Sequence, residues 1–98
     1  MRRYKIIRQA NPSDPSIAER RLRLRGYQLL RSNKTDEAIA IFMANVELYP
    51  QFWNAYDCLG EAFAKKGDKE SAIQNYEHAL RLNPGAETAK KALQELRK

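Results

Sequence analysis

The stretch YDCLGEAFAKKGDKESAIQNYEHALRLNP, residues 56–84, decides the fold of this 98-residue chain. Its apolar residues recur every three to four positions on both sides of Gly67, which is the spacing of amphipathic helices. Gly67 is typical of a helix end, and Asp68 directly after it is a preferred N-cap residue. Pro84 cannot continue a helix, so the second helix should end near Asn83. The stretch therefore predicts two helices joined by a tight turn.

The same pattern occurs 34 residues earlier in the chain. Gly26 aligns with Gly60, and Phe42 aligns with Tyr76. The remaining coincidences join residues of like kind: Asn33 with Gly67, Ala38 with Ala72, Ile39 with Ile73, Leu48 with Leu82 and Pro50 with Pro84. So many matches at one offset indicate two copies of one helix–turn–helix unit. No alternation typical of strands runs through the sequence, which therefore predicts an all-α fold.

Helix ends in the first unit are predicted from similar signals. Ser16 and Glu19 fit a capping box at the start of a helix that should run over residues 17–31. Thr35 is the predicted N-cap of a second helix, which should stop before Pro50.

Two glycines in helix interiors indicate close packing. Glycine in a helix interior costs roughly 1 kcal/mol relative to alanine, yet Gly26 and Gly60 both lie mid-helix, one repeat apart. We expect each glycine to let a neighbouring helix approach, with Phe42 and Tyr76 filling the space between the helices.

On these residues the chain resembles the tetratricopeptide repeat family, whose unit is a 34-residue helical hairpin. In residues 53–86 the matching residues are Tyr56, Leu59, Gly60, Phe63, Gly67, Ala72, Tyr76, Ala79 and Pro84. In residues 19–52 they are Leu22, Gly26, Leu29, Ala38, Phe42 and Pro50. Arg25 stands where the family prefers leucine, and Asn45 where it prefers alanine. These departures suggest that the first unit lies at one end of the array.

The resemblance implies an α-solenoid of tandem helix–turn–helix hairpins. We expect an N-terminal extension or linker at residues 1–15 and a repeat domain over residues 16–98. Within this domain we expect repeat one at residues 19–52, repeat two at residues 53–86 and a capping helix at residues 87–98. Arrays of this kind usually need about three units for stability. The opening segment, a second copy of the chain or a missing domain could supply the remaining cover.

The charge is concentrated in the N-terminal third. The net charge is +6, but residues 1–34 contain ten basic residues against two acidic ones, whereas residues 35–98 contain eight against ten. Attraction to an acidic partner should therefore act through the first third. No run of about 18 apolar residues predicts a membrane span, and no signal-peptide core is recognisable. The compartment stays unknown, with the cytoplasm as the default expectation.

Few residues suit catalysis. Cys58 is the only cysteine and His78 the only histidine, so we expect a packing role for the first and a half-exposed helix position for the second. Asp57 and Glu61 lie one helical turn apart, but no histidine accompanies them. No phosphate-binding loop, zinc-ligand spacing or serine-nucleophile elbow is present in the sequence. We expect no enzymatic activity, no metal and no cofactor.

The resemblance implies binding instead. In the family, the first helices of successive units line a concave groove, and side chains three to four apart share one helix face. The residues that would face this groove are Arg20, Arg23, Tyr27, Arg31, Asn54, Asp57, Glu61 and Lys65, with Lys91 joining from the last helix. We expect a protein or peptide ligand with acidic groups. The mode in which some members of the family bind a C-terminal carboxylate is not indicated. It needs particular lysine, asparagine and arginine residues, and Arg23, Tyr27 and Cys58 stand at the equivalent positions here.

Two other functions stay open. A weaker resemblance links the chain to repeat tails appended to bacterial serine hydrolases of the penicillin-binding and β-lactamase-like type, which would imply a structural or dimerisation role and a homo-oligomer. Weak nucleic-acid binding through the N-terminal arginine cluster is the second alternative, with Tyr4 and Tyr27 available for stacking on bases. No recognised nucleic-acid module supports it.

Overall fold

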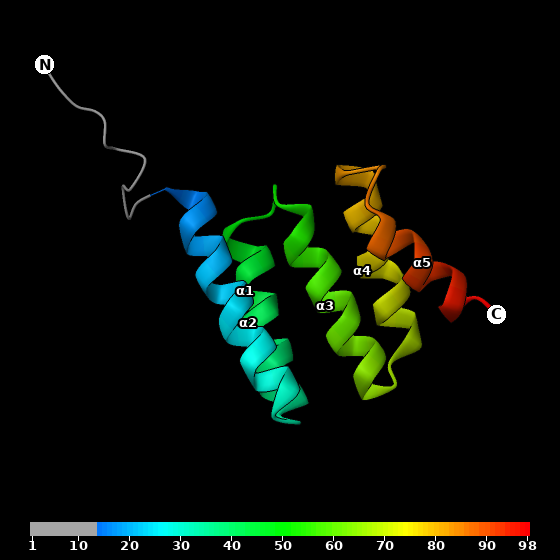
Figure 1. The fold of residues 1–98 in the computed structure, drawn as a ribbon, viewed down its shortest axis with the longest axis horizontal. Helices are drawn as coiled ribbons and strands as arrows, with labels where there is room; N and C mark the ends of the chain where they lie inside the picture. Colours follow the sequence, from blue (N-terminus) through cyan, green and yellow to red (C-terminus); the bar gives the residue numbers. More distant parts are fainter. Residues whose placement is uncertain (1–13) are drawn as a thin grey trace, which may run out of the picture.

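The computed structural model describes residues 14–98, which form a row of five helices (Figure 1). They are α1 (Pro15–Arg31), α2 (Thr35–Leu48), α3 (Trp53–Lys66), α4 (Lys69–Leu82) and α5 (Glu87–Leu96). Residues 14–98 contain no strand, so the predicted all-α class is confirmed. The predicted extension at residues 1–15 lies almost entirely outside the described residues, and so does Tyr4.

Two predicted helix starts are wrong. At α1, Asp14 is the N-cap and accepts a hydrogen bond from the Ser16 N–H at 2.9 Å. Pro15 follows at the first helical position, where its missing N–H has no cost. The capping box predicted for Ser16 does not form, because Glu19 is turned into the core. At α2, Lys34 occupies the cap position without a side-chain bond, and Thr35 lies inside the helix.

The predicted turn between α3 and α4 is confirmed. Gly67 caps α3 in the left-handed conformation, with φ of 94°, and its N–H bonds to the carbonyl of Ala64. Asp68 accepts from the Ser71 N–H at 3.1 Å and so caps α4. Hydrogen bonding by the Ser71 side chain, and then by its backbone N–H, lowers the pKa of Asp68. Asn33 has φ of 63° at the equivalent point between α1 and α2, so both turns use the residues that tolerate this conformation.

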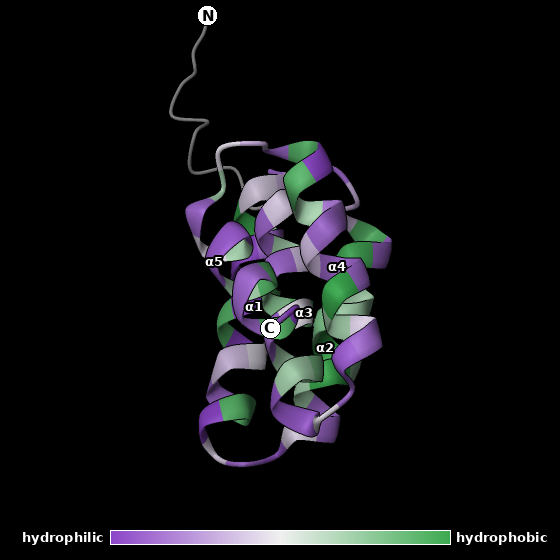
Figure 2. Ribbon diagram, turned by 90° about the vertical axis from the view of Figure 1, so that its right-hand side faces the viewer, coloured by the Kyte–Doolittle hydropathy of each residue, from purple (hydrophilic) through white to green (hydrophobic). Residues whose placement is uncertain are grey.

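The helices pack as consecutive antiparallel neighbours. α1 lies against α2 and α3 against α4 as hairpins, and α2 also packs on α3 and α4 on α5. The most hydrophobic helix is α2 (Figure 2), and it packs against both α1 and α3. One buried cluster joins the first three helices: Leu29, Leu30, Ala38, Ile39, Phe42, Cys58, Leu59 and Ala62. A second joins the last two helices and the segment between them: Ala72, Tyr76, Ala79, Ala86, Ala89 and Leu93.

Both helix-interior glycines have the predicted packing role. A Cβ atom placed on Gly26 would lie 2.6 Å from Cζ and 2.7 Å from Cδ1 of Phe42. A Cβ atom on Gly60 would lie 3.0 Å from the ring of Tyr76. The aromatic ring of each second helix therefore occupies the space that the glycine of the first helix leaves open.

Candidate functional site

Side chains from α1 and α3 tie the two hairpins together across the predicted groove. The Tyr27 hydroxyl donates to Glu61 Oε1 at 3.1 Å, and Lys65 Nζ donates to the carbonyl of Leu30 at 2.8 Å. Arg31 lies over the Tyr27 ring, with its guanidinium carbon 5.9 Å from the ring centroid. These residues surround a hollow of about 190 Å³ near the end of α1. Four of the predicted groove residues are thus brought together.

A larger hollow lies beside the first half of α1. Its volume is about 570 Å³, and Arg20, Arg23 and Asn54 line it together with Arg21. Apolar lining comes from Ile17, Leu24 and Phe52. The predicted groove residues therefore fall into two groups, one around each hollow, with Asp57 and Lys91 belonging to neither.

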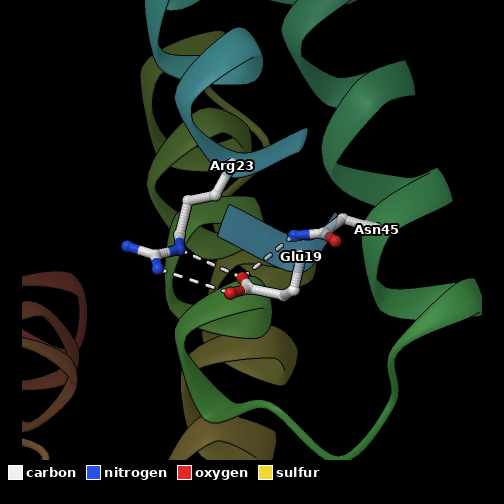
Figure 3. A network of polar contacts seen from close by, with 3 residues as sticks. All are labelled: Glu19, Arg23 and Asn45. Atoms are coloured by element: carbon white, nitrogen blue, oxygen red, sulfur yellow. Dashed lines mark hydrogen bonds and ion pairs between the residues drawn. The ribbon is translucent and has the colours of Figure 1, made fainter. Parts of the chain in front are cut away.

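A buried polar network supports the larger hollow (Figure 3). Arg23 Nε and NH2 donate to the two carboxylate oxygens of Glu19 at 3.0 and 3.3 Å, and Asn45 Nδ2 donates to Glu19 Oε2 at 3.1 Å. The Glu19 side chain is 2% exposed and Asn45 is 0% exposed, whereas Arg23 keeps 25% of its side chain exposed. The guanidinium of Arg23 is thus held in place and neutralised on the side that faces the core.

The sequence contained a signal for this network that the predictions did not use. Asn45 aligns with Ala79 at the 34-residue offset, and Glu19 aligns with Trp53. Two positions that are apolar in the second repeat are therefore polar in the first. Asn45 Nδ2 gives the buried Glu19 carboxylate a partner, whereas Asn45 Oδ1 is buried without one in residues 14–98. The departure at Asn45 is thus explained by its bond to Glu19.

Asp57 is directed towards the last helix. Its Oδ2 accepts from the Thr88 hydroxyl at 3.1 Å, which links α3 to α5, and its Oδ1 is buried without a hydrogen-bond partner in residues 14–98. Burial raises the pKa of Asp57, Thr88 lowers it, and the nearby Glu61 raises it further. Asp57 therefore serves the α3–α5 contact in this structure.

Cys58 and His78 occupy packed positions. Cys58 is 2% exposed in the first cluster, and burial raises the pKa of its thiol to about 12. The His78 ring stacks on Tyr56 with centroids 3.9 Å apart. Burial, then the charge of Arg81, lowers the pKa of His78. Residues 14–98 contain no cluster of three potential metal ligands.

We expect Cys58 to react slowly with thiol reagents in the folded protein. A free thiol has a pKa of roughly 8.5 and is partly ionised at pH 8, whereas the buried thiol stays protonated. Labelling by a disulfide reagent at pH 8 should be about a hundredfold slower in buffer than in urea. The chain has no second cysteine to confuse the readout. Equal rates in both solvents would contradict the packing role.

Comparison with known proteins agrees with this geometry. The sequence profile of the tetratricopeptide repeat matches residues 53–86. The chain contains a tetratricopeptide repeat. The fold also superimposes on the first repeat domain of Spaghetti (RPAP3), a structure bound to the HSP90 peptide SRMEEVD, with a TM-score of 0.76 and 25% identity. That superposition covers 90% of this chain and 67% of the other.

Curated relatives share the repeat within much longer proteins. Cellulose synthase operon protein C of Escherichia coli K12 is 33% identical over 76 residues, which is 78% of this chain and 6% of that protein. The chloroplastic repeat protein PYG7 of Arabidopsis thaliana is 32% identical over 65 residues, or 66% and 22% of the two chains. The chain thus spans a small part of these relatives.

The fold is one that typically serves protein–protein interaction and not catalysis. Among the described residues, no helix has both the length and the apolar character that crossing a membrane requires.

Proposed function

We propose that this module binds a segment of another protein along the face shared by α1 and α3, through acidic groups on that segment. The observation that carries the proposal is the unpaired basic charge beside the two hollows. Arg20 and Arg31 are exposed, and no carboxylate of residues 14–98 lies within 4.0 Å of their guanidinium groups. An acidic ligand can pair with them without displacing an existing ion pair.

The apolar walls of the larger hollow add contact area to this charge. Ile17, Leu24 and Phe52 line the space next to Arg20. A peptide that alternates acidic and apolar side chains could therefore bury the latter while its carboxylates meet the arginines. The RPAP3 repeat domain supports this kind of ligand, since the peptide bound to it, SRMEEVD, contains three acidic residues.

Rigid anchoring distinguishes Arg23 from its neighbours. Because Glu19 fixes two of its nitrogen atoms, Arg23 can offer a ligand only the remaining side of its guanidinium. A group held in advance loses little conformational entropy on binding. Its net charge contribution is small, so the long-range attraction comes from Arg20 and Arg31.

A peptide-display selection tests the proposal. Wild-type protein should enrich acidic peptides with interspersed apolar residues, and the variant Arg20→Glu/Arg31→Glu should lose this preference. The matched control Lys69→Glu/Arg81→Glu changes the net charge equally on α4, where both residues are exposed, and should enrich the wild-type peptides. Identical enrichment by wild type and the α1 variant would overturn the proposal. A dimer that the α1 substitutions dissolve would overturn it too, because the face would then serve self-assembly.

A further inference from the structure

Three helices, α1, α3 and α5, occupy equivalent places in successive repeats. The same face can be compared in all three, and in α1 it differs from the other two. In α3 this face consists of small or apolar residues that lie against α2: Ala55, Cys58, Leu59 and Ala62. The same positions in α5, 34 residues later, lie against α4: Ala89, Ala92, Leu93 and Leu96. In both cases this face packs against the helix that precedes it in the chain.

The corresponding face of α1 is chemically different. Subtracting 34 from the α3 positions gives Arg21, Leu24, Arg25 and Gln28, which we call the end face. All four residues are exposed, Leu24 by 51%, and none belongs to either buried cluster. In Figure 1, α1 and α2 form one extremity of the row of helices. Arg25, which stands where the family prefers leucine, thus belongs to a face that differs as a whole from its counterparts in α3 and α5.

The basic residues at the two ends of the row of helices differ in whether they have acidic partners. In α5 and the residues after it, Lys90 pairs with Glu87 and Lys98 with Glu95, and Arg97 contacts Glu77 on α4. On the end face, by contrast, no carboxylate of residues 14–98 comes within 4.0 Å of the guanidinium nitrogens of the two arginines. The positive charge at this extremity therefore has no internal partner in the part of the chain that the structure describes.

We propose that the end face binds an acidic amphipathic helix of a partner protein. Arg21 and Arg25 lie one turn apart, a spacing that suits two carboxylates one turn apart on a facing helix. Leu24 stands between them and offers an apolar contact. Another apolar repeat helix does not fit this face, because burying two arginines without partners is strongly unfavourable. Arg21 and Leu24 also line the larger hollow, so the end face adjoins the groove, whereas Arg25 and Gln28 line neither hollow. The proposal does not depend on the peptide ligand proposed above.

The chain's own opening segment is a poor occupant on grounds of charge. Residues 1–13 contain four basic residues and no aspartate or glutamate. They cannot neutralise the end face and would add to its repulsion. The experiment described next distinguishes a second copy of the chain from a different partner protein.

The test uses two acetylated and amidated helical peptides of one design. One peptide carries glutamates one turn apart on either side of a leucine over three turns, and the other carries glutamines at the same positions. By fluorescence anisotropy, wild-type protein should bind the glutamate peptide at least tenfold more tightly, and the preference should shrink between 50 and 300 mM salt, on the order of the screening expected for exposed charges. Amide shifts in the NMR spectrum should change at Arg25 and Gln28, which line neither hollow.

Substitutions locate the binding. Arg21→Gln/Arg25→Gln should weaken binding of the glutamate peptide about tenfold or more, which corresponds to the loss of charge-assisted pairs. Arg21→Ala/Arg25→Leu, which installs the residues of α3, should do the same. Arg20→Gln is the matched control and should leave the affinity within about twofold, since this residue faces the groove.

Three results would overturn the inference. Equal affinity for the two peptides would show that charge is not recognised. A loss with Arg20→Gln as large as that with the end-face variant would move the binding to the groove. Self-association that Arg21→Gln/Arg25→Gln abolishes would make a second copy the occupant. The display selection varies Arg20 and Arg31, whereas these measurements vary Arg21 and Arg25, so the two proposals can fail separately.

Discussion

Replacing Arg23 by alanine is expected to lower the free energy of unfolding by about 3 kcal/mol, the low end of the range for breaking a buried ion pair. The truncation leaves the Glu19 carboxylate 2% exposed with a single hydrogen bond, from Asn45. The lower end of the range applies because the Arg23 side chain is itself 25% exposed, so solvent screens part of the pair.

Urea unfolding followed by circular dichroism measures this loss. The matched control is Arg20→Ala on the same helix, where the side chain is exposed and the change should stay within about 0.5 kcal/mol. The double variant Glu19→Gln/Arg23→Ala should recover part of the loss, since a neutral amide costs less to bury than a carboxylate. Equal effects of Arg23→Ala and Arg20→Ala would show that the pair adds nothing to stability.

This expectation changes how the groove can be tested. The resemblance to the family implies that Arg23 faces a ligand, together with Arg20 and Arg31. Charge reversal at Arg23 would place a second carboxylate beside Glu19 and would damage the fold. A loss of binding in such a variant would then be uninformative. The substitutions at Arg20 and Arg31 avoid this problem because neither residue has a carboxylate partner in residues 14–98.

The helices and their closest contacts could be predicted because they depend on local pattern and on repetition. Gly67 and Asp68 form the predicted turn, for which a left-handed residue and a cap are sufficient. The errors at Ser16 and Thr35 are shifts of one or two residues: Asp14 caps α1, and α2 begins at Thr35 after Lys34, which makes no side-chain cap bond. At α1 the pair Asp14 and Pro15 satisfies the helix start, and tertiary packing draws Glu19 away.

The direction of a charged side chain could not be predicted in the same way. Glu19 and Arg23 have the i,i+4 spacing of an ion pair within one helix, which a sequence can show, but the burial of Glu19 and its bond to Asn45 on α2 depend on tertiary packing. Arg25 is likewise explained only by comparison with Leu59, the equivalent residue of α3. Leu59 packs on α2, whereas the equivalent face of α1 is exposed. Both cases depend on packing against α2, on which the periodicity of α1 or α3 alone contains no information.

Gly26→Ala should destabilise the protein by about 2 kcal/mol, within the range for inserting a methyl group into a packed core. In an exposed helix interior the same change would stabilise by roughly 1 kcal/mol. Here the new Cβ would lie 2.6 Å from Cζ of Phe42, whose side chain is 0% exposed and has no room to move away. Gly60→Ala should cost less, because the corresponding approach to Tyr76 is 3.0 Å.

A double variant separates the clash from other effects of the substitution. Phe42→Leu alone should destabilise, because it removes buried ring area that nothing replaces. Combined with Gly26→Ala, the smaller side chain makes space for the new methyl group, so the two losses should sum to more than the loss of the double variant. A coupling of this sign in urea unfolding would show that the glycine is required by the ring, as expected for residues in contact. Additive losses would mean that α1 shifts to accept the methyl group, and the close approach would then not explain the glycine.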